Sequence, residues 1–208
     1  SDPLKPVWAD NLADGIHGKA ADFNGSGDNK FTTTTTTTTN TFDPNDGLTV
    51  SLWVQVDGDS PVDDLIMQDT NFKIRLGPGG REDLDLFISG ASVLPTNPYP
   101  PTSNVFGPDK WTHIALTHGD LTGTSNGTWR LYVNGDLVLE QPTTTNFSPK
   151  TISIGSTFRG AIDEVEIYTR GLAEAEIREL AGLYVLDSSG NGNHGVLIDG
   201  DETVSVSG

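Results

Sequence analysis

Hydrophobic and polar residues alternate along most of this chain, which is the pattern of strands that bury one face of a sheet. The alternation is clearest over residues 48–56, 72–76, 84–89, 111–118 and 129–140, with shorter runs at 151–155 and 161–168. Asn134 and Gly135 separate two alternating halves of the longest run, which predicts a type I′ hairpin turn because both central residues need positive φ. A wider hairpin turn is expected between Leu76 and Asp83. Many short strands divided by Gly, Pro and Asn predict an all-β fold, a two-sheet antiparallel β-sandwich of jelly-roll type.

One short helix is expected near residues 172–180. Its sequence places Leu172, Ala175, Ile177 and Leu180 near one helical face, so the helix is expected to cap the sheets. The whole chain, residues 1–208, is expected to form a single domain, because all-β folds of this length commonly use one core.

The four tryptophans divide into two groups by their place in the pattern. Trp53 and Trp111 lie inside alternating strands and are expected in the core. Trp8 and Trp129 lie near chain ends or turns, and they are the better candidates for an exposed contact with a ligand.

The segment 90–110 holds five of the twelve prolines, so it cannot form a central strand. Two interpretations stay open for it. It is either a surface crossover or a loop that presents Tyr99 and Phe106 to a ligand.

Eight consecutive threonines, residues 32–39, form the one low-complexity segment. Because threonine is β-branched and favours strands, the tract indicates a strand that runs into a surface loop. Two other interpretations are a flat row of hydroxyl and methyl groups that matches an ordered surface, and a cluster of O-glycan acceptors.

The chain carries 12 Lys and Arg residues against 29 Asp and Glu residues, a formal net charge of −17. Such a surface repels polyanions, which argues against nucleic acid or an anionic membrane surface as a partner. It fits cation binding or an extracellular setting. No run approaches the roughly 20 apolar residues of a membrane span, and no cysteine is present to mark the compartment by a disulfide.

Five segments resemble, in the same order, those of a known family. They are "AADFNGSGD" (20–28), "LTVSLWV" (48–54), "KWTHIALTH" (110–118), "WRLYVNGDLV" (129–138) and "ISIGSTFRGAIDEVEIYTRGLAEAEIREL" (152–180). The family is the laminin-G-like, concanavalin A-like jelly rolls found as modules in secreted bacterial and archaeal proteins. The resemblance implies a secreted or cell-surface location. It also implies a non-catalytic binding or adhesion role, with carbohydrate or another surface ligand as partner.

The resemblance also implies a calcium site. In that family an equivalent turn often binds Ca²⁺ together with the aspartate of the "IDEV" strand, which is Asp163 here. Asp28, Asp163 and the carbonyl of Gly25 would then coordinate the ion with help from Asn24, since Ca²⁺ prefers oxygen ligands on Gly-rich turns. A plain tight turn without metal is the alternative. Zinc is not expected, because the chain has no cysteine and its four histidines lack the usual ligand spacing.

The strand at 161–168 argues against an enzyme. Hydrolases of this sandwich class carry Glu-x-Asp-x-x-Glu or Glu-x-Asp-x-Glu on one strand, and two of those carboxylates act as nucleophile and general acid. Here the first position is Gly160 or Ala161, so the nucleophile is missing. Alternation is expected to place Glu164 and Glu166 on one face and Asp163 on the other.

Three Asn-x-Ser/Thr sequons occur in the chain. Asn126 and Asn146 are the candidate glycosylation sites. The third sequon begins at Asn24, inside the expected metal turn, where a glycan would interfere.

The motif "DSSGNGNHG" at 187–195 lies near the start of the domain in the resembled family, but here it follows the helix. Three explanations stay open: a circularly permuted strand order, the opening of a second repeat, or a strand added to the sheet of a neighbouring copy. In the last case the protein would be a structural subunit of an extracellular filament or surface assembly, linked through residues 187–208. Asp187, Asn191 and Asn193 would hold the turn by side-chain bonds or contact a second cation.

Overall fold

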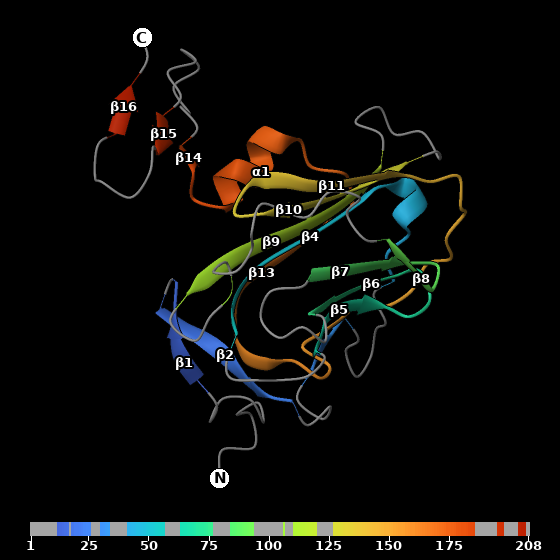
Figure 1. The fold of residues 1–208 in the computed structure, drawn as a ribbon, viewed down its shortest axis with the longest axis horizontal. Helices are drawn as coiled ribbons and strands as arrows, with labels where there is room; N and C mark the ends of the chain where they lie inside the picture. Colours follow the sequence, from blue (N-terminus) through green and yellow to red (C-terminus); the bar gives the residue numbers. More distant parts are fainter. Residues whose placement is uncertain are drawn as a thin grey trace.

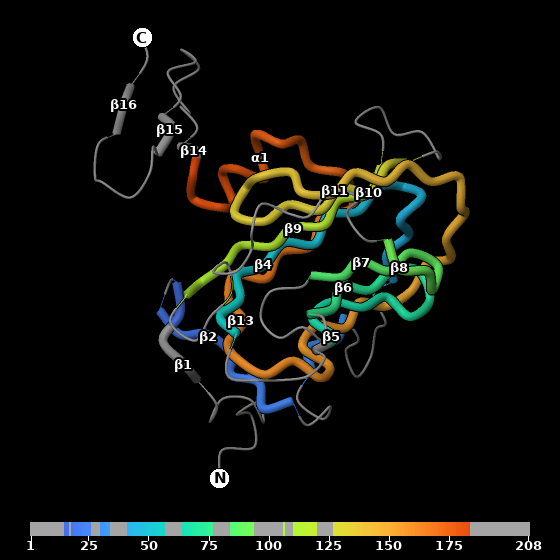
Figure 2. The backbone as a smooth tube through the Cα atoms, viewed as in Figure 1, coloured from blue at the N-terminus to red at the C-terminus, as the bar shows by residue number. Residues whose placement is uncertain are grey.

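The larger sheet has seven antiparallel strands in the order β1-β2-β13-β4-β9-β10-β11. The computed structural model describes residues 12–16, 18–25, 30–33, 41–56, 63–76, 84–93, 106, 110–119, 127–185, 195–197 and 204–206. The seven strands are β1 (Leu12–Gly15), β2 (Gly18–Asn24), β13 (Arg159–Tyr168), β4 (Leu48–Val56), β9 (Trp111–Gly119), β10 (Thr128–Val133) and β11 (Asp136–Pro142). β13, β4 and β9 run side by side through its middle (Figure 2).

The second sheet has six antiparallel strands in the order β3-β12-β5-β6-β7-β8. They are β3 (Phe31–Thr32), β12 (Ser153–Ile154), β5 (Asp63–Gln68), β6 (Phe72–Leu76), β7 (Leu84–Ile88) and β8 (Ala91–Val93). One hydrophobic cluster joins residues of both sheets, so the sheets pack face to face (Figure 1). The predicted two-sheet antiparallel sandwich is confirmed.

Strand β4 shows how the alternation of the sequence builds this core. Its even-numbered residues from Leu48 to Val56 are all buried and belong to the cluster between the sheets. Full burial of such a side chain contributes about 1.5–3 kcal/mol to folding. The odd-numbered residues, from Thr49 to Gln55, therefore point away from the core, because successive side chains of a strand face opposite sides.

Strand β5, like β2, is not among the strands that the alternation predicts. A bulge interrupts its pairing with β6 between Asp64 and Ile66, and Leu65 and Ile66 are both completely buried. A bulge allows two consecutive residues to face inward, which removes the period of two from the sequence.

The hairpin turn at Asn134 and Gly135 is confirmed. Their φ angles are +48° and +79°, and the turn joins β10 to β11. A Cβ added at Gly135 would lie 2.8 Å from Leu183 Cδ1, so this turn lies against the segment that follows the helix.

The predicted helix is confirmed as α1 (Glu174–Leu180), which covers part of the outer face of the seven-stranded sheet (Figure 1). Leu172 and Ile177 are buried there against Ala115 of β9 and Tyr132 of β10. Ala175, expected on the packed face, is exposed instead, because a helix of two turns presents only a narrow stripe to a flat sheet. The Ala173 N–H donates to Glu176 Oε2 at 2.9 Å and so caps the first turn.

Amide side chains fix the connection between β11 and β12. Asn45, in the 3₁₀ turn Pro44–Asp46, donates to the Phe147 carbonyl at 2.6 Å and accepts from the Phe147 N–H at 3.0 Å. Asn71 donates to the Ser148 carbonyl at 2.7 Å. These bonds replace a strand pairing and hold the segment that carries Asn146 across the end of the sandwich.

The strands β14 (Tyr184–Val185), β15 (Gly195–Leu197) and β16 (Val204–Val206) form a separate three-stranded sheet. The described part of the segment 187–208 therefore does not take a place in either sheet of the sandwich, as a permuted first strand would. It pairs within its own chain, through β14 to β15 and β15 to β16. No helix among the described residues has the length and apolar character needed to cross a membrane.

Candidate functional site

Beside α1, several outward-facing side chains of the seven-stranded sheet are only partly buried. Trp53 and Gln55 of β4 point outward and are half-buried. Trp111 of β9 is also half-buried and lies opposite Gln55, while Asp163 of β13 lies opposite Trp53. We call Trp53, Gln55, Trp111 and Asp163 the Trp53 surface.

The expectation that Trp53 and Trp111 belong to the core is wrong. Both tryptophans are on the outer face of the sheet. The signal was present in the sequence, since Trp53 shares its period of two with Thr49, Ser51 and Gln55, whereas the opposite face of β4 is entirely aliphatic.

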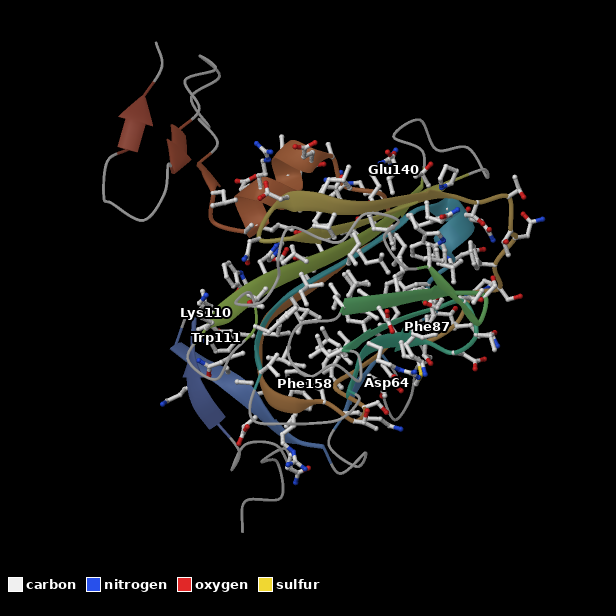
Figure 3. All side chains as sticks on the ribbon, viewed as in Figure 1. Asp64, Phe87, Lys110, Trp111, Glu140 and Phe158 are labelled. Carbon is white, nitrogen blue, oxygen red and sulfur yellow. The ribbon has the colours of Figure 1, made fainter. Side chains whose placement is uncertain are left out.

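Register fixes the spacing of the two tryptophan positions in the sheet. Trp53 lies opposite His113, and Trp111 is two positions before His113 on the same strand. Diagonal neighbours of this kind are about 7–8 Å apart. Figure 3 shows Trp111 beside the exposed Lys110 at one end of β9. Three adjacent strands thus present two aromatic rings, an amide and a carboxylate on one face.

His113 supports Trp53 from the neighbouring strand. The two rings are 5.3 Å apart at 60°, and Ser51 Oγ lies 2.8 Å from His113 Nε2. Burial lowers the pKa of His113 to about 4, so the imidazole is neutral near pH 7. His113 is therefore a neutral packing partner that fixes the position of the Trp53 ring.

The Ser51–His113 pair lacks the geometry of a hydrolase triad. In such a triad an acid binds the second imidazole nitrogen and orients the ring. His113 Nδ1 has no hydrogen-bond partner among the described residues, and both side chains are buried away from solvent. The pair thus contributes to the packing behind Trp53.

Asp163 is engaged by the backbone around it. Its Oδ1 accepts the Glu164 N–H at 2.9 Å, and Glu164 has a φ of +48°. A Cβ on Gly15 would overlap Asp163 Oδ2, so only glycine allows β1 to approach this carboxylate so closely. Asp163 therefore holds a bulge in β13 and lies against the tip of the β1–β2 hairpin.

The bulge overturns the expected orientation of the acidic residues on β13. Asp163 pairs with Trp53 and Glu166 with Ser51, so these two carboxylates share the outer face. The expectation that Asp163 faces away from Glu166 is wrong, because the bulge between them shifts the alternation by one residue. Glu166 accepts a hydrogen bond from the Tyr168 hydroxyl, and this bond, with burial, raises the pKa of Tyr168 to about 12.

The residues expected to bind calcium do not converge in the described part of the chain. Asn24 lies opposite Arg159, four residues before Asp163 on β13, and at about 3.3 Å per residue that separation is roughly 13 Å. Gly25 lies near the guanidinium of Arg159, a poor neighbour for a cation. Asp28 is outside the described residues. No group of three or more His, Asp or Glu side chains within the described segments could hold a metal ion.

Trp129 is completely buried, so its expected role as an exposed ligand contact is wrong. It lies opposite His118 on the inner side of the sheet, and the two ring centroids are 4.4 Å apart. Its alternation with Leu131 and Val133 outweighs its position next to a turn. Phe106 is buried in the main core, which also removes it as a ligand contact, and Tyr99 lies outside the described residues.

The remaining candidates are polar. Asn146 is exposed on the amide-held segment, as a glycosylation site requires. Asn126, Asp187, Asn191 and Asn193 lie outside the described residues.

Solved structures with a similar fold include three domains of larger proteins. Domain 4 of AbnA, an extracellular arabinanase from Geobacillus stearothermophilus solved in complex with arabinotriose, is 23% identical, with a TM-score of 0.53 over 82% of this chain and 80% of that one. The binding domain of Paraclostridial mosquitocidal protein 1 is 19% identical, with a TM-score of 0.58 over 82% of this chain and 44% of that one. The receptor-binding domain of botulinum neurotoxin type G is 16% identical, with a TM-score of 0.55 over 82% and 43%. At these identities the likeness shows a common fold.

No curated protein matches the sequence. A family model does match, over residues 25–178, which is most of the sandwich. The match includes β4, β9, β10 and β13, the strands that build the Trp53 surface and its neighbours. The chain therefore belongs to the concanavalin A-like lectin/glucanases superfamily.

Proposed function

We propose that this protein is a non-catalytic, extracellular binding module that recognises carbohydrate through the Trp53 surface. The observation that carries the proposal is the pair of half-buried tryptophans on one sheet face, next to Gln55 and Asp163. Indole rings offer a broad apolar face at the water boundary. The C–H face of a sugar ring packs on such a surface, while its hydroxyls bond to amide and carboxylate groups at the edge.

The fold comparisons support this proposal at the level of class. One similar structure is a domain bound to arabinotriose, and two others are binding domains of toxins. Since one fold hosts many functions, the ligand class depends on the Trp53 surface itself. The formal charge of −17 fits an extracellular setting.

The protein is proposed to be non-catalytic because the two carboxylates on this face of the sheet already accept hydrogen bonds. Asp163 accepts the Glu164 N–H, and Glu166 accepts the Tyr168 hydroxyl. A general acid or nucleophile needs a carboxyl group free to meet the glycosidic bond. Calcium remains a prediction that depends on Asp28 and its turn.

The proposal is tested by calorimetric titration of the wild type and of the W53A and W111A variants with arabinotriose, after a glycan array has added further candidates. Each substitution is expected to weaken binding at least tenfold, about 1.4 kcal/mol, because each removes one stacking ring. Phe31→Ala is the matched control, since Phe31 is an exposed aromatic on another sheet. Titrations with added Ca²⁺ and with a chelator test the metal prediction in the same experiment. Binding that is absent from the array, or unchanged in both tryptophan variants, contradicts the proposal.

A second candidate function is a structural subunit joined to its neighbours by strand exchange. The observation that favours it is the small sheet β14-β15-β16, which stands apart from the sandwich. Its strands have only two or three residues each, and a sheet so small has little stability of its own. Pairing with the sheet of another copy would increase that stability.

A further inference from the structure

On the other side of the sandwich, one row of outward-facing side chains crosses the whole six-stranded sheet. Register aligns Thr32, Ser153, Met67, Lys73, Phe87 and Ser92 from edge to edge. Hydroxyl groups occupy both ends of the row, and the larger side chains occupy its centre. With about 4.8 Å between strands, the row is roughly 24 Å long.

A rigid charged cluster lies beside the centre of this row. Lys73 Nζ is 3.1 Å from Asp64 Oδ2, and Arg75 Nε is 3.0 Å from Asp64 Oδ1. The Asp64 N–H donates to Thr157 Oγ1 at 2.9 Å. The carboxylate is thus held by two cations from one strand, and its backbone is tied to a neighbouring segment.

The aromatic ring of Phe87 packs against this charged cluster. The Arg75 guanidinium carbon lies 4.8 Å from the centroid of the Phe87 ring, and this cation–π contact fixes the plane of the guanidinium. Lys73 lies directly opposite Phe87 across the strand pair. We call Asp64, Lys73, Arg75 and Phe87 the Phe87 surface.

We propose that the Phe87 surface, with its row of hydroxyls, is a second binding site for a neutral polysaccharide chain that lies across the strands. Asp85 lies opposite Arg75 on β7, so two acids and two cations balance on this face, which suits an uncharged polyol, and the net charge of −17 repels a polyanion. Fixed donors and acceptors beside a ring are the features that bind sugar hydroxyls and a sugar face together.

The two surfaces lie on different sheets, with the hydrophobic core between them. Figure 3 shows Trp111 and Lys110 on the seven-stranded sheet, and Phe87 and Asp64 on the six-stranded sheet. One module would thus hold a chain on each face. Two linked sites on a long polymer give an apparent affinity that exceeds either alone, by roughly 10²-fold where the geometry allows both to engage.

This inference rests on the proposed function, and affinity electrophoresis separates the two. Gels contain arabinan, xylan or mixed-linkage β-glucan as neutral polymers, and polygalacturonate as an anionic one. The variants are the double variant W53A/W111A, the single variant F87A and the triple variant. Leu137→Ala is the matched control, because it removes an exposed apolar side chain from β11, away from both surfaces.

The double variant is expected to remain retarded by at least one neutral polymer, with an affinity at least tenfold below that of the wild type. F87A should weaken binding by a similar factor, and only the triple variant should migrate as in an empty gel. If the double variant is not retarded at all, or F87A behaves like L137A, the second site is refuted while the Trp53 surface stands. A wild type that none of the neutral polymers retards refutes both proposals. Retardation by polygalacturonate alone contradicts a neutral ligand.

Discussion

Trp53 takes its position from the residues beside it in the sheet. His113 packs against its ring from β9, and Asp163 lies opposite it on β13. Each neighbour is tied to another residue by a hydrogen bond: the His113 N–H donates to the side-chain Oδ1 of Asn134 at 2.9 Å, and the Asp163 carboxylate accepts the Glu164 N–H. The turn at Asn134 and the bulge in β13 therefore fix the positions of the two residues beside Trp53.

His113 makes the stability of the fold depend on pH. Its pKa is lowered from 6.5 to about 4 because burial disfavours the charged imidazole. Between pH 6.5 and about 4, His113 therefore binds a proton in the unfolded chain but not in the folded chain. The contribution of neutral His113 to the free energy of unfolding is about 3 kcal/mol. It is fully present above pH 6.5 and is lost as the pH falls towards 4.

We expect His113→Gln to flatten this pH dependence, although the variant itself is less stable at pH 7. Urea unfolding at several pH values between 7 and 4 measures the free energy of unfolding of both proteins. Carboxylates also titrate in this window, so the quantity that matters is the difference between wild type and variant. Equal losses in the two proteins would show that His113 does not contribute.

At the level of elements, the turn between β10 and β11 is tied to α1 through Gly135. This residue has a φ of +79°, and a Cβ there would lie 2.8 Å from Leu183 Cδ1 and 3.3 Å from Ala181 Cβ. Gly90 has the same φ, but among the residues that the structure describes no atom beyond its chain neighbours lies within 4 Å of an added Cβ. The two glycines differ only in the packing around them.

Gly135→Ala is therefore expected to destabilise the protein more than Gly90→Ala. Both variants bear the backbone cost of a left-handed alanine, roughly 1–2 kcal/mol. G135A also displaces Leu183, which should add about 1 kcal/mol. Urea unfolding at pH 7 compares them, and equal losses would mean that the turn does not pack against the helix segment.

Most elements could be predicted from the alternation, and the bulges in β5 and β13 mark where that prediction ends. Strands β4 and β6 have the predicted bounds, and the turn at Asn134 and Gly135 has the predicted φ signs. The bulge in β5 removes the alternation, and the bulge in β13 turns Asp163 to the side of Glu166. A bulge depends on the partner strand, which a single strand sequence does not contain.

The candidate site was less predictable than the fold. The period of two did place Trp129 inside and Trp53 outside, but the position of Trp129 near a turn and that of Trp53 inside an alternating strand suggested the reverse. The Phe87 surface depends on register across six strands. No local pattern brings Asp64 to Lys73 and Arg75.

For the whole molecule, none of the described C-terminal strands belongs to either sheet of the sandwich. Within the described segments, both main sheets consist of strands before α1, and β15 and β16 pair only in the small sheet. The binding module and the strand-exchanged subunit differ in what residues 187–208 do. In the first case these residues leave the fold unaffected, and in the second they join one copy to the next.

Deleting residues 187–208 tests which of these descriptions holds. Because the deletion removes no strand of the sandwich, we expect a monomer before and after it, with a melting temperature changed by less than about 2 °C, below roughly 1 kcal/mol. Size-exclusion chromatography with light scattering and a thermal melt measure both quantities. Larger assemblies that vanish on deletion would support strand exchange instead. A monomer that loses many degrees would mean that the segment completes its own sandwich, as a permuted first strand does. Sugar binding measured on the same two proteins should not change, because both proposed surfaces lie on sheets that the deletion leaves intact.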